Sequence, residues 1–305
     1  MKKPYYFLHI LVLFFSVQYA QIYGQQTEID TNIQSEYNHA IKLFNSKAYA
    51  AAQKYFIRVS ENSTIKNDLK ANADYYDAMC AIKLNQTNAD KKVIRFVNNY
   101  PSSTKKDRAY FNVGNYYFAN KKAAYALKWY SKVNLDALSL ANKKELNFKM
   151  GYAFLSTRNL DLAKNKFVLL INDPKYGNDS RYYFGYISYK QEDYEIAEKT
   201  LEEIADDEAY KSEVTYYLLD ISFKAGRFEK CIEVGLKLLE NAKPKEVSEI
   251  SKIIGESYFN LKKYKESIDY LKAYRGKKGK WNNTDYYQLG YAFFKQNDFE
   301  NAVNN

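Results

Sequence analysis

The feature that most constrains this chain is a sequence period of 34 to 38 residues. Gly151 and Gly185 lie 34 residues apart, and each is followed twelve residues later by an alanine, Ala163 or Ala197. A fixed period of this length is typical of stacked supersecondary units, each of which buries its apolar face against its neighbours. The period therefore favours a repeat architecture over a single globular core.

The period extends over almost the whole chain when one residue of each unit is taken as its anchor. The anchors are Ala40, Ala78, Gly114, Gly151, Gly185, Leu219, Gly255 and Gly290. The residues twelve positions after them are Ala52, Asp90, Ala126, Ala163, Ala197, Cys231, Ser267 and Ala302. All of the second set except Asp90 are small. Small residues at these positions predict two helices that cross closely in each unit.

The positions of the prolines agree with this division into repeating units. Pro101, Pro174 and Pro244 fall between one repeating unit and the next, where a proline can end a helix and does not interrupt one. No segment alternates between apolar and polar residues over the length of a strand, so no sheet is predicted.

The pattern resembles the tetratricopeptide repeat (TPR), a helix–turn–helix motif of 34 residues. The resemblance covers about residues 34–305 and rests on MG at 150–151, FG at 184–185, LG at 289–290, and YxxA at 49–52 and 194–197. It implies an all-α, right-handed superhelical solenoid of seven complete repeats and one partial repeat. The repeats are expected to start near residues 34, 71, 107, 144, 178, 212, 248 and 284.

The wider resemblance is to exported TPR proteins of Bacteroidota envelopes, which are also rich in tyrosine and asparagine. The YPSS sequence at residues 100–103 is similar to the repeat junctions of envelope TPR proteins. The last repeat stops soon after Ala302, which predicts that the sequence is the N-terminal part of a longer protein. A frayed natural C-terminus is the alternative.

The N-terminus predicts export. Residues 1–24 read as a signal peptide, with a basic start, an apolar run over residues 5–17 and small residues at Ala20 and Gly24. An uncleaved membrane anchor is the alternative, but a spanning helix needs about 20 apolar residues. Residues 25–33 form a polar lead-in. No cysteine lies near the cleavage site, so we expect a periplasmic or outer-membrane-associated protein that is not a lipoprotein.

The chain is basic, with 46 Lys and Arg against 36 Asp and Glu, a net charge of +10. For an exported protein this charge favours an anionic envelope polymer, a lipid surface or an acidic protein over nucleic acid as an additional partner. A solvated basic surface without a partner is the alternative. The candidate basic loop comprises Arg275, Lys277, Lys278, Lys280 and Trp281. A solvated turn is the alternative for this loop.

The sequence contains few residues of the kinds that usually carry out catalysis. The two histidines are His9, in the predicted signal peptide, and His39, which we interpret as a packed or surface residue. Cys80 and Cys231 are four repeats apart and are expected to be buried, unpaired small residues. No metal, cofactor or enzyme activity is predicted, although carboxylate-dependent glycan cleavage stays open because carboxylates are abundant.

The TPR resemblance implies that the first helix of each repeat lines a concave groove that binds peptides or extended segments. The groove positions lie three before, one after and four after each anchor. The favoured candidates are Tyr152, Tyr182, Tyr186, Tyr189, Tyr216, Tyr287 and Tyr291. The same positions hold Tyr37, Phe44, Tyr75, Phe111, Phe118, Phe148, Phe223, Phe259 and Phe294. The alternative is that these aromatic stripes belong to the core.

The function predicted from these features is a non-catalytic protein–protein interaction scaffold that binds a protein segment in the groove. Tyrosine suits such a surface because it offers a large contact area, a polar tip and few rotamers. The chaperone-type carboxylate clamp of the family is not expected, since its lysine and asparagine positions are mostly aromatic here. The alternative function is the extracytoplasmic sensor part of a longer signalling protein.

Overall fold

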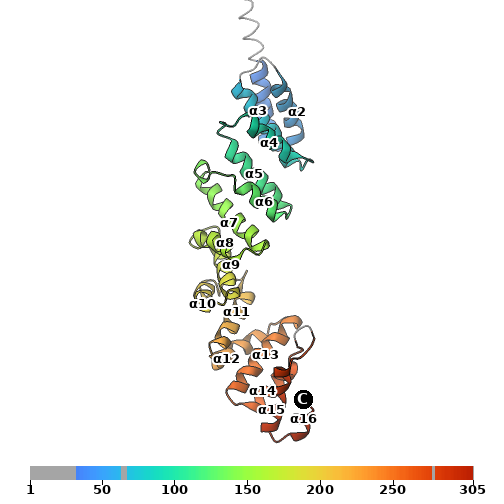
Figure 1. Ribbon diagram of the computed structural model, residues 1–305, viewed down its shortest axis with the longest axis vertical. Coiled ribbons are helices and arrows are strands. Elements are labelled where there is room, and N and C mark those ends of the chain that lie inside the picture. Colours follow the sequence, from blue (N-terminus) through green and yellow to red (C-terminus); the bar gives the residue numbers. More distant parts are fainter. Residues whose placement is uncertain (1–31, 63–66, 277–278, 305) are drawn as a thin grey trace, which may run out of the picture. The chain divides into compact units, whose positions relative to one another are not determined.

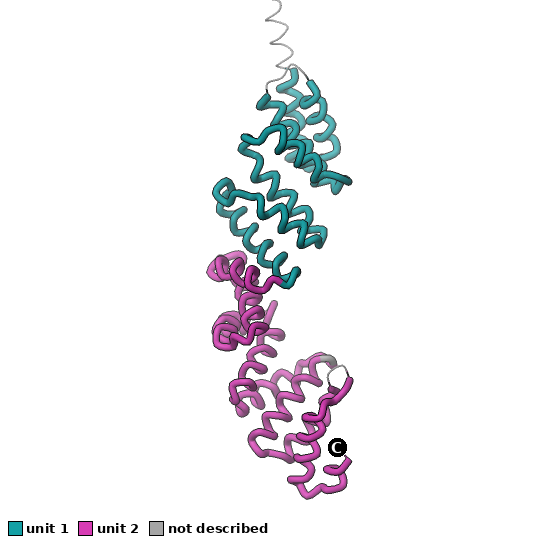
Figure 2. The backbone as a smooth tube through the Cα atoms, in the orientation of Figure 1, with its two compact units in different colours: residues 1–158 teal, residues 159–305 magenta. Residues whose placement is uncertain are grey.

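A computed structural model describes residues 32–62, 67–276 and 279–304, and these residues contain helices and turns but no β-strand element (Figure 1). The predicted all-α class is confirmed. The predicted signal peptide and nearly all of the lead-in lie outside the described residues. The chain divides into two compact units, residues 1–158 and residues 159–305 (Figure 2). The division falls inside the fourth predicted repeat.

Unit 1 is a series of antiparallel helix pairs. Its first described helix covers residues 32–45. The helices that follow are α2 (Tyr49–Glu61), α3 (Asn67–Lys83), α4 (Ala89–Asn99), α5 (Lys106–Ala119), α6 (Ala123–Tyr130) and α7 (Leu140–Ser156). A short 3-10 helix, η1 (Leu135–Ala137), precedes α7, which begins where the Ser139 side chain accepts a hydrogen bond from the Asn142 backbone N–H.

Unit 2 continues the same alternation. Its helices are α8 (Leu160–Phe167), η2 (Val168–Leu170), α9 (Gly177–Lys190), α10 (Tyr194–Glu202), α11 (Lys211–Lys224), α12 (Phe228–Leu239), α13 (Pro244–Asn260), α14 (Tyr264–Ala273), α15 (Asn283–Lys295) and α16 (Phe299–Val303). Pro244 is the first residue of α13. Proline lacks a backbone N–H, but the N–H at this position would have no hydrogen-bond acceptor within the helix. The number of complete repeats stays a prediction.

The anchor residues are the points of closest packing within the helix pairs. All eight anchors are buried, and so are six of the eight residues twelve positions later. A Cβ atom on Gly114 would lie 2.3 Å from the Tyr130 ring, and one on Gly185 would lie 2.7 Å from Leu201. These glycines are needed because the second helix rests directly on the backbone of the first.

The pair α3–α4 departs from the predicted spacing. Its connection, residues 84–88, has five residues, whereas the connections of the other pairs have three. The buried small residue of this pair is Ala89, eleven positions after Ala78, and not Asp90. The half-buried Asp90 instead accepts a hydrogen bond from the Tyr117 hydroxyl at 2.9 Å.

A buried charge network accompanies this longer connection. The Asp77 side chain is 5% exposed and accepts hydrogen bonds from Lys92 Nζ at 2.7 and 2.8 Å. It also accepts one from Gln53 Nε2 at 2.8 Å, which ties α2 to α3. Because a buried carboxylate is stable only when it is paired and hydrogen-bonded, the network fixes how these helices meet.

The turns repeat as regularly as the helices. A residue seven positions after each anchor has a left-handed backbone, with φ between 57° and 73°. These residues are Lys47, Asn85, Lys121, Arg158, Glu192, Gly226, Lys262 and Asn297. Only one of them is glycine, so the backbone of the turn is imposed by the packed helices and not by the residue type.

Candidate functional site

Four of the predicted groove tyrosines come together in unit 2. Tyr182, Tyr186 and Tyr189 lie on one face of α9, because residues spaced by three and four share a face of a helix. Tyr217 of α11 joins them, with its ring centroid 5.8 Å from that of Tyr186 and 4.9 Å from that of Tyr189. Tyr216, also predicted, lies beside Tyr217 with ring centroids 6.0 Å apart. We call these five residues the tyrosine cluster.

The members of the tyrosine cluster are half-buried and held in place. The Tyr189 hydroxyl donates to Asp220 at 2.6 Å, and the Tyr182 ring stacks on Tyr210 at 4.6 Å between centroids. Burial, followed by the hydrogen bond to Asp220, raises the pKa of Tyr189 far above its ordinary value. Burial also raises the pKa of Tyr182, Tyr216 and Tyr217. The raised pKa values keep the phenols of Tyr182, Tyr189, Tyr216 and Tyr217 protonated, so these four hydroxyls are hydrogen-bond donors.

Cations border this cluster. The Lys224 ammonium lies 5.0 Å from the centroid of the Tyr189 ring and pairs with Asp220. The Lys190 ammonium lies 5.6 Å from the Tyr186 ring centroid and 5.5 Å from that of Tyr189. Such contacts attract a cation to the negative face of an aromatic ring. They fix the edge of the tyrosine cluster, so its rings are arranged before any ligand arrives.

The other predicted tyrosines lie elsewhere. Tyr287 stacks on Tyr291 in α15 at 5.7 Å, and Tyr291 contacts Phe259 of α13 at 5.8 Å. Tyr287 is the more open of the two, at 62% exposed. Tyr152 belongs to unit 1, where its ring lies 5.9 Å from Phe118. Within unit 2, Tyr287 and Tyr291 thus form an aromatic group distinct from the tyrosine cluster.

The sequence pattern included two residues that belong to the core and omitted one residue of the tyrosine cluster. Tyr75 and Phe111 occupy predicted groove positions but are 4% exposed, so they are core residues. Tyr217 lies two positions before its anchor and was missed. Aromatic residues recur at that position as Tyr76 and Tyr183, which stack on Phe56 and Phe167 of the preceding second helix. That recurrence is the pattern from which Tyr217 could have been found.

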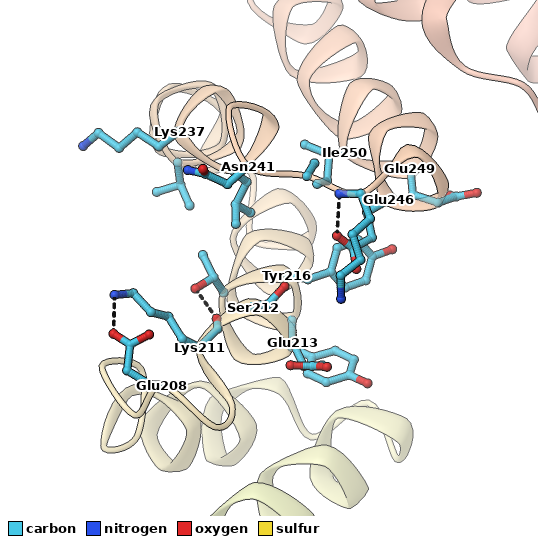
Figure 3. A pocket seen from close by; sticks show the side chains of 16 residues that line it. Glu208, Lys211, Ser212, Glu213, Tyr216, Lys237, Asn241, Glu246, Glu249 and Ile250 are labelled. Atoms are coloured by element: carbon cyan, nitrogen blue, oxygen red, sulfur yellow. Dashed lines mark hydrogen bonds and ion pairs between the residues drawn. The ribbon is translucent and has the colours of Figure 1, made fainter.

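Next to the tyrosine cluster, a pocket of about 880 Å³ opens between α11, α12 and α13 (Figure 3). Its apolar part is formed by Val234, Leu238 and Ile250, together with Tyr216 and Tyr217. Its charged lining residues are Glu208, Lys211, Glu213, Lys237, Lys243, Glu246 and Glu249. The volume is within the range of small-ligand pockets, about 300–1,000 Å³.

Solved structures share the arrangement of helix pairs. The structure of Naa15/Naa10 bound to HypK-THB matches with a TM-score of 0.58 and 13% identity, over 86% of this chain and 39% of that chain. The chain has the TPR fold. YrrB, described as a TPR protein with an unusual peptide-binding site, matches 70% of this chain and 96% of its own at 14% identity and a TM-score of 0.48. A TPR protein from Parabacteroides merdae matches 86% of this chain and 98% of its own, at 11% identity and a TM-score of 0.45. No family model and no curated protein matches the chain.

The predicted basic loop joins α14 to α15 of this TPR array. Arg275 and Lys280 are exposed, while Lys277 and Lys278 lie outside the described residues. Trp281 is half-buried, because its indole N–H donates to the Tyr274 carbonyl at 2.9 Å and its ring stacks on Tyr274. The tryptophan therefore holds the loop against the TPR array. Arg275 and Lys280 are the exposed cations in the described part of this loop.

The surroundings of His39, Asp207, Cys80 and Cys231 show how these residues are held in the fold. His39 is exposed and meets the edge of Tyr55, with centroids 4.7 Å apart. Asp207 accepts hydrogen bonds from Asn178 and from the Ala209 backbone in a turn. Cys80 and Cys231 are buried and free, as predicted, and burial raises the pKa of the Cys80 thiol to about 12.

Among the described residues, no group of three or more His, Cys, Asp or Glu side chains could hold a metal ion. In the same residues, no helix combines the length and the apolar character that a membrane crossing requires.

Proposed function

We propose that this chain is a non-catalytic interaction scaffold of the cell envelope, located in the periplasm or at the outer membrane. It binds a protein segment along the first helices of its repeats. The observation that carries this proposal is the tyrosine cluster on α9 and α11, whose five rings are half-buried and pre-arranged. Rigid aromatic side chains of this kind favour binding because little rotamer entropy is lost.

The fold supports the general class of this function. TPR arrays present extended faces, and a rigid face gains affinity from many small contacts with a segment laid along it. The envelope location follows from the predicted signal peptide at residues 1–24. The sensor role and an anionic polymer or lipid surface as a second partner stay predictions.

Tyr186 is the best position for a test. Its ring stacks on Tyr182 at 6.4 Å and contacts Tyr217, whereas Tyr182 and Tyr189 also hold other helices through Tyr210 and Asp220. Changing Tyr186→Ala therefore removes contact surface with the least damage to packing. The matched control is Tyr125→Ala, which removes a 57% exposed tyrosine from the second helix of another pair.

The experiment is affinity capture from the native envelope fraction with residues 25–305 as bait, at low and high salt, read by quantitative mass spectrometry. We expect partners that survive high salt, at least about fivefold less of them with Tyr186→Ala, and unchanged capture with Tyr125→Ala; fivefold corresponds to about 1 kcal/mol. Equal capture by all three folded proteins would remove the tyrosine cluster as the binding surface. Partners that are lost at high salt would favour the exposed cations Arg275 and Lys280 instead.

A further inference from the structure

We propose that the pocket between α11, α12 and α13 receives a lysine or arginine side chain of the bound protein segment. This assignment rests on the proposed scaffold function and names the chemistry of one residue in the partner. The evidence is the distribution of charge around the pocket, the position of its aromatic rings and the contrast with the rest of this basic chain.

Most of the charges around the pocket are already paired. Lys211 Nζ lies 3.1 Å from Glu208 Oε1, and Lys237 Nζ lies 2.8 Å from Glu233 Oε1. Glu246 accepts a hydrogen bond from the Lys243 backbone N–H at 3.1 Å, and so caps the first turn of α13. Two cations and two carboxylates are therefore matched to each other, and the positive end of α13 is covered by Glu246.

Of the charged lining residues, Glu213, Glu249 and the exposed Lys243 remain. The two glutamates are exposed and occupy the position six residues before their anchors, Glu213 on α11 and Glu249 on α13. Within the described residues, neither carboxylate takes part in an ion pair or a hydrogen bond. The equivalent residues Glu145 and Asp179 are engaged, by Lys149 and by the Tyr210 hydroxyl. The pocket thus has two carboxylates available to an incoming cation.

The two carboxylates act on the aromatic rings between them. After burial, the negative charges of Asp220 and Glu249 raise the pKa of Tyr216, and Glu213 contributes in the same way to Tyr217. Glu213 and Glu249 therefore place two negative charges near Tyr216 and Tyr217 in the lining of the pocket. In Figure 3, Glu213, Glu246, Glu249 and Tyr216 lie on one side of the view, and the Lys211–Glu208 pair lies on the other.

The rest of the lining suits a long cationic side chain. Val234, Leu238 and Ile250 provide apolar contacts for the methylene groups, since lysine and arginine bury their stems while the charged head finds polar partners. Tyr216 and Tyr217 offer ring faces to the cation, which adds attraction beyond the carboxylates. An acidic or neutral side chain would lose both contributions. In a chain of net charge +10, this pocket is a local exception.

The test uses a fluorescein-labelled Gly/Ser-rich peptide of twelve residues with three spaced arginines. Its matched probe replaces each arginine by citrulline, which has nearly the same shape and no charge. Binding to residues 25–305 is measured by fluorescence anisotropy at constant ionic strength, for wild type, for the Glu213→Gln/Glu249→Gln double variant, and for Glu229→Gln. Glu229 is an exposed carboxylate of α12 that does not line the pocket.

We expect wild type and Glu229→Gln to prefer the arginine peptide by about tenfold, and the double variant to show a preference of less than about twofold, because tenfold in affinity is about 1.4 kcal/mol. Equal binding of the two peptides to wild type overturns the proposal, as does an undiminished preference in the double variant. Failure to saturate wild type with the arginine peptide below about 1 mM, the weak limit of useful affinity, also overturns it.

The two proposals fail separately. Loss of captured partners with Tyr186→Ala, combined with no arginine preference, retains the scaffold and removes only the charge assignment of the pocket. An arginine preference that depends on Glu213 and Glu249, combined with unchanged capture by Tyr186→Ala, retains the pocket and removes the tyrosine cluster as the main binding surface.

Discussion

The pairs α3–α4 and α9–α10 perform the same structural task with different chemistry. In α9–α10, Gly185 and Ala197 let the helices approach closely, and Leu201 fills the space over Gly185. In α3–α4, the connection is two residues longer and a buried Asp77–Lys92 ion pair holds the second helix. The comparison teaches that a TPR hairpin can be fixed either by tight apolar packing or by a specific ion pair, at nearly the same repeat length.

The largest loss of stability is expected when the ion pair between Asp77 and Lys92 is broken. Lys92→Met leaves the buried Asp77 with a hydrogen bond from Gln53 and a longer ion pair, at 3.9 Å, with the exposed Arg95. Unit 1 should therefore lose about 3 kcal/mol, the low end of the range for removing one member of a buried pair. Hydrogen exchange of residues 67–99 and denaturation followed by circular dichroism measure this loss. The control Lys91→Met changes an exposed neighbour and should leave both unchanged. Equal stability of the two variants would show that the pair is dispensable.

The next largest loss of stability is expected when the close crossing of α9 and α10 at Gly185 is disturbed. Gly185→Ala places a Cβ 2.7 Å from the Leu201 side chain, and overpacking of this kind costs about 2 kcal/mol. Leu201→Ala makes room for the new methyl group. We therefore expect the double variant to lose less stability than the sum of the two single variants, measured by chemical denaturation. Additive losses would mean that Gly185 is not in contact with Leu201 in solution.

A smaller effect concerns the turns of the same two pairs. Glu192 and Asn85 both have left-handed backbones, with φ of 63° and 57°. Glu192→Gly should stabilise unit 2 by up to about 1 kcal/mol, because glycine has no Cβ penalty in this region. Asn85→Gly should change the free energy of unfolding by less than about 0.3 kcal/mol, since asparagine tolerates this conformation. Thermal unfolding compares them, and equal gains would argue against relief of strain.

The smallest effect depends on pH. Burial, followed by the hydrogen bond to Asp74, raises the pKa of Tyr100 at the end of α4 to about 12, above its unfolded value of about 10. A raised pKa contributes stability below the unfolded value, and this contribution is lost as the pH rises through the folded value. The wild-type protein should therefore lose stability between about pH 10 and 12.

Tyr100→Phe removes this source of pH dependence. The variant should be less stable at neutral pH by about 0.5–1 kcal/mol, the usual net value of one hydrogen bond, and should lose less stability in alkali. Urea denaturation at several pH values gives both quantities. Tyr125→Phe, in an exposed position, is the control and should follow the wild type. An alkaline loss in Tyr100→Phe as large as in wild type would contradict the assignment.

Much of the fold was predictable because helix crossings require small residues at a fixed spacing, and Gly114, Gly185 and Ala197 follow that spacing. The position of the small residue at Ala89 could not be predicted, because it accompanies an irregular start of α4 and an ion pair between Asp77 and Lys92, which no spacing rule specifies. The alternation of helices could be predicted from the period, whereas the division of the chain after Arg158 could not.

The candidate site was predictable in part. The positions of Tyr182, Tyr186 and Tyr189 on one helical face follow from their spacing. Whether an aromatic residue faces solvent or the next repeat depends on the rotation of each helix, which is why Tyr75 proved to be buried. The availability of Glu213 and Glu249 depends on which neighbours pair with each other, and spacing carries no information about that choice.

The shared left-handed turn gives the chain a further property. The same backbone conformation recurs at the same point of each helix pair. At these points, the chain leaving one repeat therefore has the same local geometry as the chain leaving any other repeat. Deleting residues 193–226 would join Glu192 to Arg227 with the turn geometry on both sides unchanged, and inserting a copy of that stretch would be equally compatible. An ancestral gene could therefore have lengthened or shortened by whole repeats through recombination, without any new hairpin having to evolve.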